Sequence, residues 1–92
     1  MNAAPARIAL AGAVTFATHG EARARLADAL ARGDVVVDWS AVDAVDSCAV
    51  SLILYSRRSA AASGRRVRHE HLPGSLDALA TLYGVGDLLA DG

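Results

Sequence analysis

The stretch VVVDWSAVDAVDSCAVSLILYSRR, residues 35–58, decides the fold. It opens with three consecutive valines, and such a continuous β-branched run is typical of a strand buried on both faces of a parallel sheet. A helix is predicted to begin after Asp46 and to end at Gly64, because aspartate is a favoured N-cap and glycine a favoured C-cap. Ser47 and Cys48 stand at the start of that helix. The stretch therefore predicts a short strand, a tight loop and a helix with a hydroxyl and a thiol at its N-terminus.

Upstream, the sequence predicts another strand and another helix. Residues 7–11 alternate large apolar residues with alanine, as strands do, and Gly12 is expected to break this strand before a short continuation at 14–16. The segment that follows has apolar residues at helical spacing and ends before a glycine. Thr18 and Glu21 are three residues apart, which predicts a capping box at the start of this helix.

Downstream, the pattern repeats once more. The sequence RRVRHEHL, residues 65–72, alternates and predicts a third strand. Pro73 and Gly74 interrupt the chain, and Ser75 is expected to cap a helix over LDALATLYGV, residues 76–85. This order of strands and helices predicts an α/β layer structure. The inward face of the last helix is predicted to comprise Leu76, Leu79, Leu82 and Tyr83.

Length and composition describe one compact domain. The chain has 92 residues, of which 53% are hydrophobic and 21% charged. A net charge of −1 gives no electrostatic reason to expect nucleic acid or an anionic membrane as the partner. No apolar run approaches the roughly 20 residues of a membrane-spanning helix. The apolar segment after Arg7 resembles a signal peptide, but its alternation and Gly12 favour a strand. With Cys48 as the single cysteine, we expect a cytoplasmic protein that does not insert into a membrane.

The start of the helix at Ser47 has a structural and a functional interpretation. In the structural one, Asp46 and Ser47 only begin the helix and Cys48 fills a small apolar gap. In the functional one, the positive potential of the helix N-terminus favours a phosphoryl group on Ser47. The same potential would lower the pKa of an exposed Cys48 thiol. The local sequence leaves both interpretations open.

No enzyme can be assembled from the remaining residues. A catalytic cysteine needs a partnered base, and no spacing ties a histidine to Cys48. His69 and His71 lie on one face of the predicted strand as candidate metal ligands, but two ligands do not make a site. The GVGD at 84–87 lacks the preceding strand and the third glycine of a dinucleotide fingerprint. We expect no catalytic site, no metal and no cofactor.

The order and spacing of residues 34–89 resemble the STAS domain family. The shared pattern is a hydrophobic strand ending in aspartate, a short polar connection, and a second aspartate followed by serine or threonine before an apolar helix. The resemblance implies a single domain over 1–92 with a core at 6–89. It also implies a mixed, mostly parallel sheet of about four strands with three to four helices, the first strand being short or missing. The matching residues are Val37-Asp38-Trp39-Ser40, Val42 and Val45-Asp46-Ser47.

Within this family the chain is most similar to the MlaB-like subunits of phospholipid ABC transporters. Those proteins keep a threonine or serine directly after the aspartate, which corresponds to Ser47. In the anti-sigma-factor antagonists, the phosphorylated hydroxyl is usually the second residue after the aspartate. Here that residue is Cys48, which cannot carry an O-phosphate. The leucine-rich pattern of the last helix in the MlaB-like branch is matched by Leu79, Leu82, Tyr83 and Val85.

The resemblance implies a non-catalytic protein-interaction module. An MlaB-like subunit docks on the ABC ATPase and regulates or stabilises it, so the domain would meet the membrane only through the transporter complex. Two alternatives stay open: an antagonist phosphorylated on Ser47 by an anti-sigma-type serine kinase, and a thiol-based enzyme or redox sensor that uses Cys48. Ser47 is the predicted switch or contact, and the predicted partner-binding residues around it are Asp46, Cys48, Ser51 and Tyr55.

Overall fold

The computed structural model describes residues 4–82, in which three strands alternate with three helices. The strands are parallel and lie in the order β1-β2-β3. The α/β fold predicted from the sequence is confirmed, with three strands in this part of the chain where about four were expected. The elements are β1 (Ala6–Val14), α1 (His19–Arg32), β2 (Val35–Val45), α2 (Ser47–Ser63), β3 (Val67–Glu70) and α3 (Gly74–Leu82).

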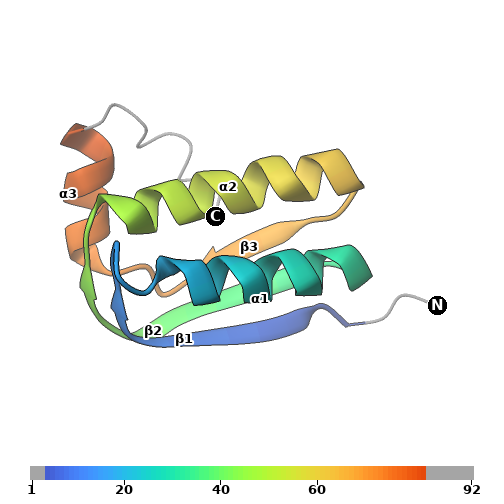
Figure 1. Ribbon diagram of the computed structural model, residues 1–92, viewed down its shortest axis with the longest axis horizontal. Coiled ribbons are helices and arrows are strands. Elements are labelled where there is room, and N and C mark those ends of the chain that lie inside the picture. The colour runs from blue at the N-terminus through green and yellow to red at the C-terminus, as the bar shows by residue number, and fades with distance from the viewer. Residues whose placement is uncertain (1–3, 83–92) are drawn as a thin grey trace.

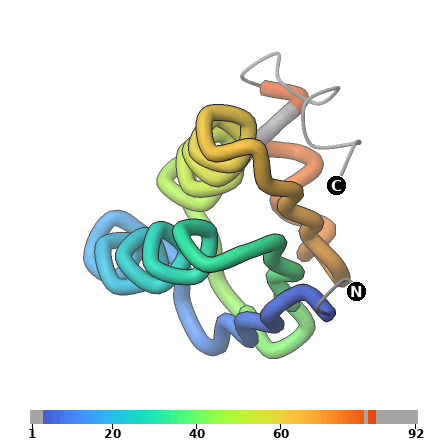
Figure 2. Tube along the Cα trace, turned by 90° about the vertical axis from the view of Figure 1, so that its right-hand side faces the viewer, coloured from blue at the N-terminus to red at the C-terminus, as the bar shows by residue number. Residues whose placement is uncertain are grey.

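Helices α1 and α2 lie side by side over one face of the sheet (Figures 1 and 2). The strand order explains this arrangement, because successive crossovers of the same hand in one direction place both helices on the same face. Helix α3 stands at one end of the molecule and packs against α2 (Figure 1). The core fills the space between sheet and helices, and its largest fully buried side chains include Leu26, Leu30, Val37, Trp39, Ile53 and Leu76.

The opposite face of the sheet carries charged side chains. Arg7 Nη2 lies 2.9 Å from Glu70 Oε1 and 4.0 Å from Asp38 Oδ2. Val36 pairs in register with Arg7 on one side and Arg68 on the other, and it is buried although it does not belong to the core cluster. The predicted burial of the valine run on both faces is therefore confirmed, with ion-paired side chains flanking the second face.

Strand β2 is longer than predicted. It continues past Asp38 to Val45, through the segment that was expected to be a loop, because β1 pairs with it as far as Val14 and Val45. The register shifts between Ala9 and Ala11 and again between Gly12 and Ala13, and β2 takes the extra residue each time. Gly12, with φ +71°, lies at the second shift. The expectation that Gly12 ends the strand was wrong, because this glycine accommodates a bulge instead.

The bulges bend the paired strands. A β-bulge increases the local twist and bends the strand that contains it. Beyond the last residue of β2 that pairs with β3, Asp38, strands β1 and β2 curl together toward the N-termini of α1 and α2 (Figure 1). This curl places the residues that follow β1 next to those that follow β2.

The caps predicted from the sequence are found in α2, but the capping box predicted for α1 is not. Helix α2 has Asp46 as its N-cap and Gly64, at φ +68°, as its C-cap, both as predicted. Thr18 precedes α1 but makes no capping hydrogen bond, so the predicted capping box with Glu21 does not form. The Thr18 hydroxyl is instead engaged by the turn before the helix.

Helix α3 begins at Gly74, so Ser75 lies inside it and is not its cap. Leu76 is buried and Leu79 partly buried, as predicted, whereas Leu82 is 75% exposed. Leucines spaced three apart drift by roughly 60° per step around an α-helix, which carries Leu82 off the inward face. The predicted inward Tyr83 lies outside the described residues, as do the rest of the predicted helix and core up to position 89. No helix within residues 4–82 is long and apolar enough to cross a membrane.

His69, one of the two candidate metal ligands, belongs to the core. Trp39 Nε1 donates to its Nδ1 at 2.9 Å, so the ring proton resides on Nε2 and points to Ser56 Oγ at 2.9 Å. Burial, assisted by the nearby positive charge of Arg57, lowers the pKa of His69 to about 4. His71 lies beyond the strand at φ +59°, exposed, with its ring 3.1 Å from Asp38. Residues 4–82 contain no cluster of three or more potential metal ligands.

Candidate functional site

The site lies where the carboxyl ends of two strands meet the N-termini of two helices. Strand β1 ends at Val14 and β2 at Val45, and α1 and α2 both begin at this end of the molecule (Figure 1). In open parallel sheets, ligands bind outside the carboxyl ends of the strands. Two helix N-termini also give it a positive potential. Ser47 is the first residue of α2, as the sequence predicted, and the structure shows that it is exposed.

Asp46 connects the two strand ends. Its Oδ1 accepts a hydrogen bond from the Cys48 N–H at 2.8 Å, which caps α2. Its Oδ2 accepts another from the Phe16 N–H at 3.0 Å, in the turn that follows β1. The N–H groups of Phe16 and Cys48 hold the pKa of the Asp46 carboxyl below its usual range. Asp46 is therefore an ionised cap that also fixes the neighbouring turn.

The turn from Thr15 to Thr18 is closed by its own hydrogen bonds. The Thr18 hydroxyl accepts from the Thr15 N–H at 2.9 Å and donates to the Ala13 carbonyl at 2.8 Å. The N–H groups of Thr18 and His19 both donate to the Thr15 carbonyl. These contacts leave Phe16 pointing into solvent with 79% of its surface exposed. The strand continuation expected at 14–16 was wrong beyond Val14, because the position of this turn depends on how β1 pairs with the bulged strand β2.

Three of the predicted site residues form a stripe along α2. Ser47, Ser51 and Tyr55 are spaced four apart, so they lie on one face of the helix. Ser51 is exposed and Tyr55 half-buried. The Arg23 guanidinium of α1 lies 4.2 Å from the centre of the Tyr55 ring, a cation–π contact. The stripe therefore leads from the start of α2 to its junction with α1, and Arg23 is a member of this surface that the sequence did not identify.

The surroundings of Cys48 do not favour its thiolate form. It is half-buried, and burial, together with the negative charge of Asp46, raises the pKa of its thiol. The lowered pKa was expected for an exposed thiol, and this condition is not met, since Cys48 is half-buried beside the Asp46 carboxylate. Nucleophilic cysteines need the opposite shift. The raised pKa counts against the hypothesis of a thiol enzyme or redox sensor.

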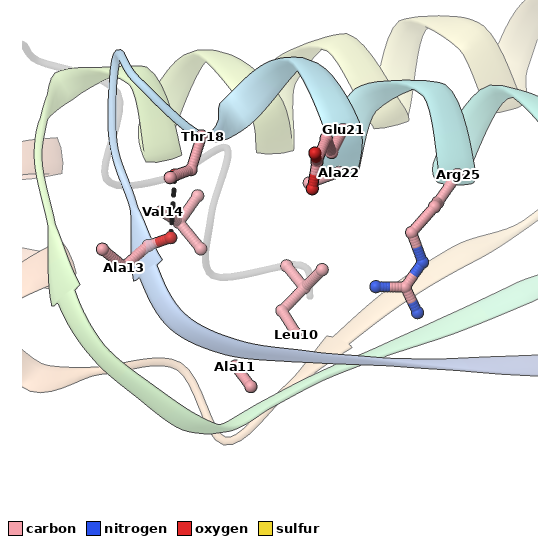
Figure 3. Close-up of a pocket in the computed structure, with 8 residues that line it drawn as sticks. All are labelled: Leu10, Ala11, Ala13, Val14, Thr18, Glu21, Ala22 and Arg25. Carbon is pink, nitrogen blue, oxygen red and sulfur yellow. Dashed lines mark hydrogen bonds between the residues drawn. The ribbon is translucent and has the colours of Figure 1, made fainter.

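A separate cavity of about 240 Å³ lies on the flank of the molecule between β1 and α1 (Figure 3). Leu10, Val14 and Ala22 give it apolar walls, and Arg25 reaches from α1 toward β1 beside it. None of the site residues predicted from the sequence lines this cavity. It shares Thr18 with the turn that follows β1 and extends from there along α1.

Comparison with protein families assigns the chain to a known class. A family model described as a MlaB-type STAS domain matches residues 1–90, almost the whole chain. The protein belongs to this family, whose members are in general binding modules without catalytic activity. A comparison with curated protein sequences gave no match.

Several solved structures share the fold, and two are described. The first, titled "Crystal Structure Analysis of Mglu", aligns with 74% of this chain at 26% identity and a TM-score of 0.63, and the aligned part makes up only 17% of that chain. The second is the anti-sigma factor antagonist SpoIIAA in its unphosphorylated form, which aligns with 95% of this chain and 80% of its own at 17% identity and a TM-score of 0.66. At 17% identity, the similarity to SpoIIAA supports a conclusion about the fold alone.

Proposed function

We propose that the domain is a non-catalytic subunit that docks on the ATPase of a phospholipid ABC transporter and stabilises or regulates it. The contact surface is the N-terminal end of α2 with the stripe that follows it. Ser47 is the central contact, and its neighbours on this surface are Asp46, Cys48, Ser51 and Tyr55.

The observation that supports this proposal most is the place of Ser47. It follows the capping aspartate directly and is exposed at the first position of α2, and the chain matches the MlaB-type family model. Around it the backbone is fixed by the two hydrogen bonds to Asp46. A small polar side chain on a fixed helix end suits a surface that binds another protein with little loss of entropy.

A second candidate is an anti-sigma-factor antagonist that is switched by phosphorylation of Ser47. The fold shared with SpoIIAA favours it, and so does the positive potential at the start of α2. Against it stands Cys48, which occupies the usual acceptor position and is half-buried.

Co-purification distinguishes the two candidates. The tagged domain is co-expressed with the ATPase subunit of the phospholipid transporter from the same cell and passed over a size-exclusion column. Co-elution in a fixed ratio is the expected result, and separate elution contradicts the proposal. The second candidate predicts instead that an anti-sigma-type serine kinase transfers phosphate to Ser47, and that a Ser47→Ala variant does not accept it.

A further inference from the structure

Strand β1 lies at one edge of the sheet, and no strand within residues 4–82 pairs with its outer side (Figure 1). Its first residue is directed toward β2, because the Ala6 N–H donates to the Asp34 carbonyl at 3.0 Å. Its last residue is too, because the Val14 carbonyl accepts from the Asp46 N–H. Neighbouring residues of a strand point their backbone groups to opposite sides, so the odd-numbered residues of β1 face the free edge. Those before Gly12 are Arg7, Ala9 and Ala11.

The free edge of β1 lacks the features that usually prevent strand pairing. Such features are proline, unpaired charges and bulges on the edge strand itself. From Ala6 to Ala11 the strand has no proline, and its one charged side chain, Arg7, is paired with Glu70 at 2.9 Å. Ala9 and Ala11 are exposed and small, and the extra residues of the bulges belong to β2. The edge is therefore open to a further strand.

Helix α1 carries a stripe of charged side chains above this edge. Four exposed residues at spacings of four, three and four share one narrow face of the helix. They are Glu21, Arg25, Asp28 and Arg32. Glu21 and Arg25 line the cavity between α1 and β1, so this face lies on the β1 side (Figure 3). The remaining arginine, Arg23, lies over Tyr55 of α2, and His19 shares the face of Arg23 because it is four residues earlier.

The charged stripe is complementary to itself when it is read in the opposite direction. Its signs alternate as acid, base, acid, base. Two antiparallel α1 helices would place Arg25 beside Asp28 of a second copy, and Glu21 beside Arg32 of that copy, each pair occurring twice. A parallel arrangement would instead bring like charges together. The stripe therefore favours an antiparallel second copy over an unrelated extended peptide, which would satisfy the backbone of β1 but not these charges.

The centre of the stripe and the open stretch of β1 lie at the same level. The centre falls between Arg25 and Asp28, about 2 Å along α1 from Arg25, which is less than one residue of a strand. Leu10 and Arg25 line the same cavity, and α1 runs back along β1 (Figure 1). The centre therefore stands over Ala9, the middle one of the three outward residues.

We propose that the domain forms a symmetric dimer in which β1 pairs antiparallel with β1 of a second copy, around a twofold axis at Ala9. Ala9 then faces its own copy and Arg7 faces Ala11, so each outward N–H and C=O group of these residues gains a partner. The three strands of each copy form one continuous sheet. The two α1 helices lie side by side on the same face of it, where their charged stripes meet. The two Arg7 side chains stay roughly 13 Å apart along the strands.

Sedimentation of the purified chain tests the dimer. One chain has a mass of 9.4 kDa, so the dimer has twice this mass. We expect a reversible dimer with a dissociation constant of roughly 1–100 μM, as for an interface of modest area. A monomer at every concentration up to about 1 mM contradicts the inference.

Charge exchange on α1 tests the arrangement of the two copies. Arg25→Glu and Asp28→Arg should each weaken the dimer by roughly tenfold, because each turns two attractive pairs into repulsive ones. The double variant restores opposite charges across the axis and should dimerise almost as well as the unaltered chain. The control is Arg58→Glu on α2, an exposed position with the same change in net charge as Arg25→Glu, and it should have no effect. Single variants without effect, or a double variant no tighter than both single ones, contradict the inference.

Disulfide formation tests the register of the two strands. With Cys48→Ser as the starting chain, Ala9→Cys places two thiols on a hydrogen-bonded pair with Cα atoms about 5.5 Å apart, within reach of a disulfide. The matched control is Ala11→Cys, whose two copies would be roughly 13 Å apart. Mild oxidation should link the Ala9→Cys chains and leave the Ala11→Cys chains unlinked. Equal linking at both positions, or none at position 9, contradicts the inference.

The dimer does not depend on the proposed function. It uses the outer edge of β1 and one face of α1, whereas the proposed docking surface lies at the start of α2. All three measurements use the domain without the ATPase. A monomeric domain would therefore overturn the dimer and leave the docking proposal standing, and a domain that does not bind the ATPase would do the reverse.

Discussion

At the scale of single residues, Asp46 joins two parts of the site that are thirty positions apart in sequence. One carboxylate oxygen caps α2 through Cys48, and the other holds the N–H of Phe16. The sequence could identify Asp46 as a cap because helix starts have a local pattern. It could not show the bond to Phe16, which exists only because β1 and β2 end side by side.

Asp46→Ala should destabilise the domain, because it leaves the first turn of α2 uncapped and releases the β1–α1 turn. A fall in Tm of roughly 4–8 °C is expected for loss of one cap in a domain of this size. The control is Asp43→Ala, which removes an exposed carboxylate three residues earlier and should leave Tm nearly unchanged. Equal Tm values for the two variants would show that Asp46 holds neither element.

Ser47, Ser51 and Tyr55 lie together on α2 as the sequence predicted, since residues four apart share one helix face. Phe16, His19 and Arg23 were missed for a physical reason. Each is ordinary in its local context, and only the packing of α1 beside α2 brings them to this surface. For Cys48 the sequence left two interpretations open, and its half-buried position agrees with the one in which it fills a small apolar gap.

At the scale of the elements, backbone conformation explains which sequence signals were reliable. Gly64 ends α2 in the left-handed region, so it predicted the end of the helix correctly. Gly12 also has positive φ, but it lies in a bulge of the β1–β2 pair and does not end the strand. The two glycines look alike in sequence, because a local pattern does not reveal whether a neighbouring strand continues to pair.

Two glycine substitutions should have opposite effects on stability. Gly64→Ala is expected to cost about 1 kcal/mol, because alanine is strained at φ +68°. Gly20→Ala, near the start of α1, is expected to stabilise by about 0.5–1 kcal/mol, since alanine favours the helix and stiffens the unfolded chain. A Cβ has open space at both positions, so contacts do not confuse the comparison. Urea unfolding measures both changes, and a change of the same sign in both variants would contradict this account.

At the scale of the whole molecule, a buried hydrogen-bonded chain connects β2, β3 and α2. It runs from Trp39 Nε1 to His69 and from His69 to Ser56, whose hydroxyl donates to the Ile53 carbonyl at 2.6 Å. Every polar atom in this chain has a partner, which makes a buried imidazole tolerable in the core. The alternation of strand and helix predicted the fold class from the sequence, but it could not reveal that His69 faces the core in this chain.

Acid should therefore weaken the fold within a defined range of pH. The pKa of His69 falls from 6.5 to about 4 on folding, so the unfolded chain binds more protons between these values. The stability that neutral, buried His69 contributes is fully present above pH 6.5 and is lost progressively as the pH falls toward 4. The total loss in the free energy of unfolding is about 3 kcal/mol.

Denaturant unfolding at several pH values, with NMR titration of the His69 ring, measures this effect. The pKa values of Asp38 and Asp46 are lowered from 3.8, so protonation of these carboxylates changes stability mainly below pH 3.8. This is outside the pH range of the His69 effect. A free energy of unfolding that stays constant from pH 6.5 to 4 would show that His69 is not the neutral, buried group described above.

The central claim is that the exposed start of α2 is a docking surface and not only a helix end. Its most direct test is the dissociation constant of the purified domain for the transporter ATPase, measured for the unaltered chain and for Ser47→Glu. An acidic residue at the first position of a helix is favourable by about 0.3–1 kcal/mol, so the variant should fold at least as stably. It should nevertheless bind at least about tenfold more weakly, because the contact then carries a charge and a larger side chain. Full affinity in a stably folded Ser47→Glu variant would contradict the account.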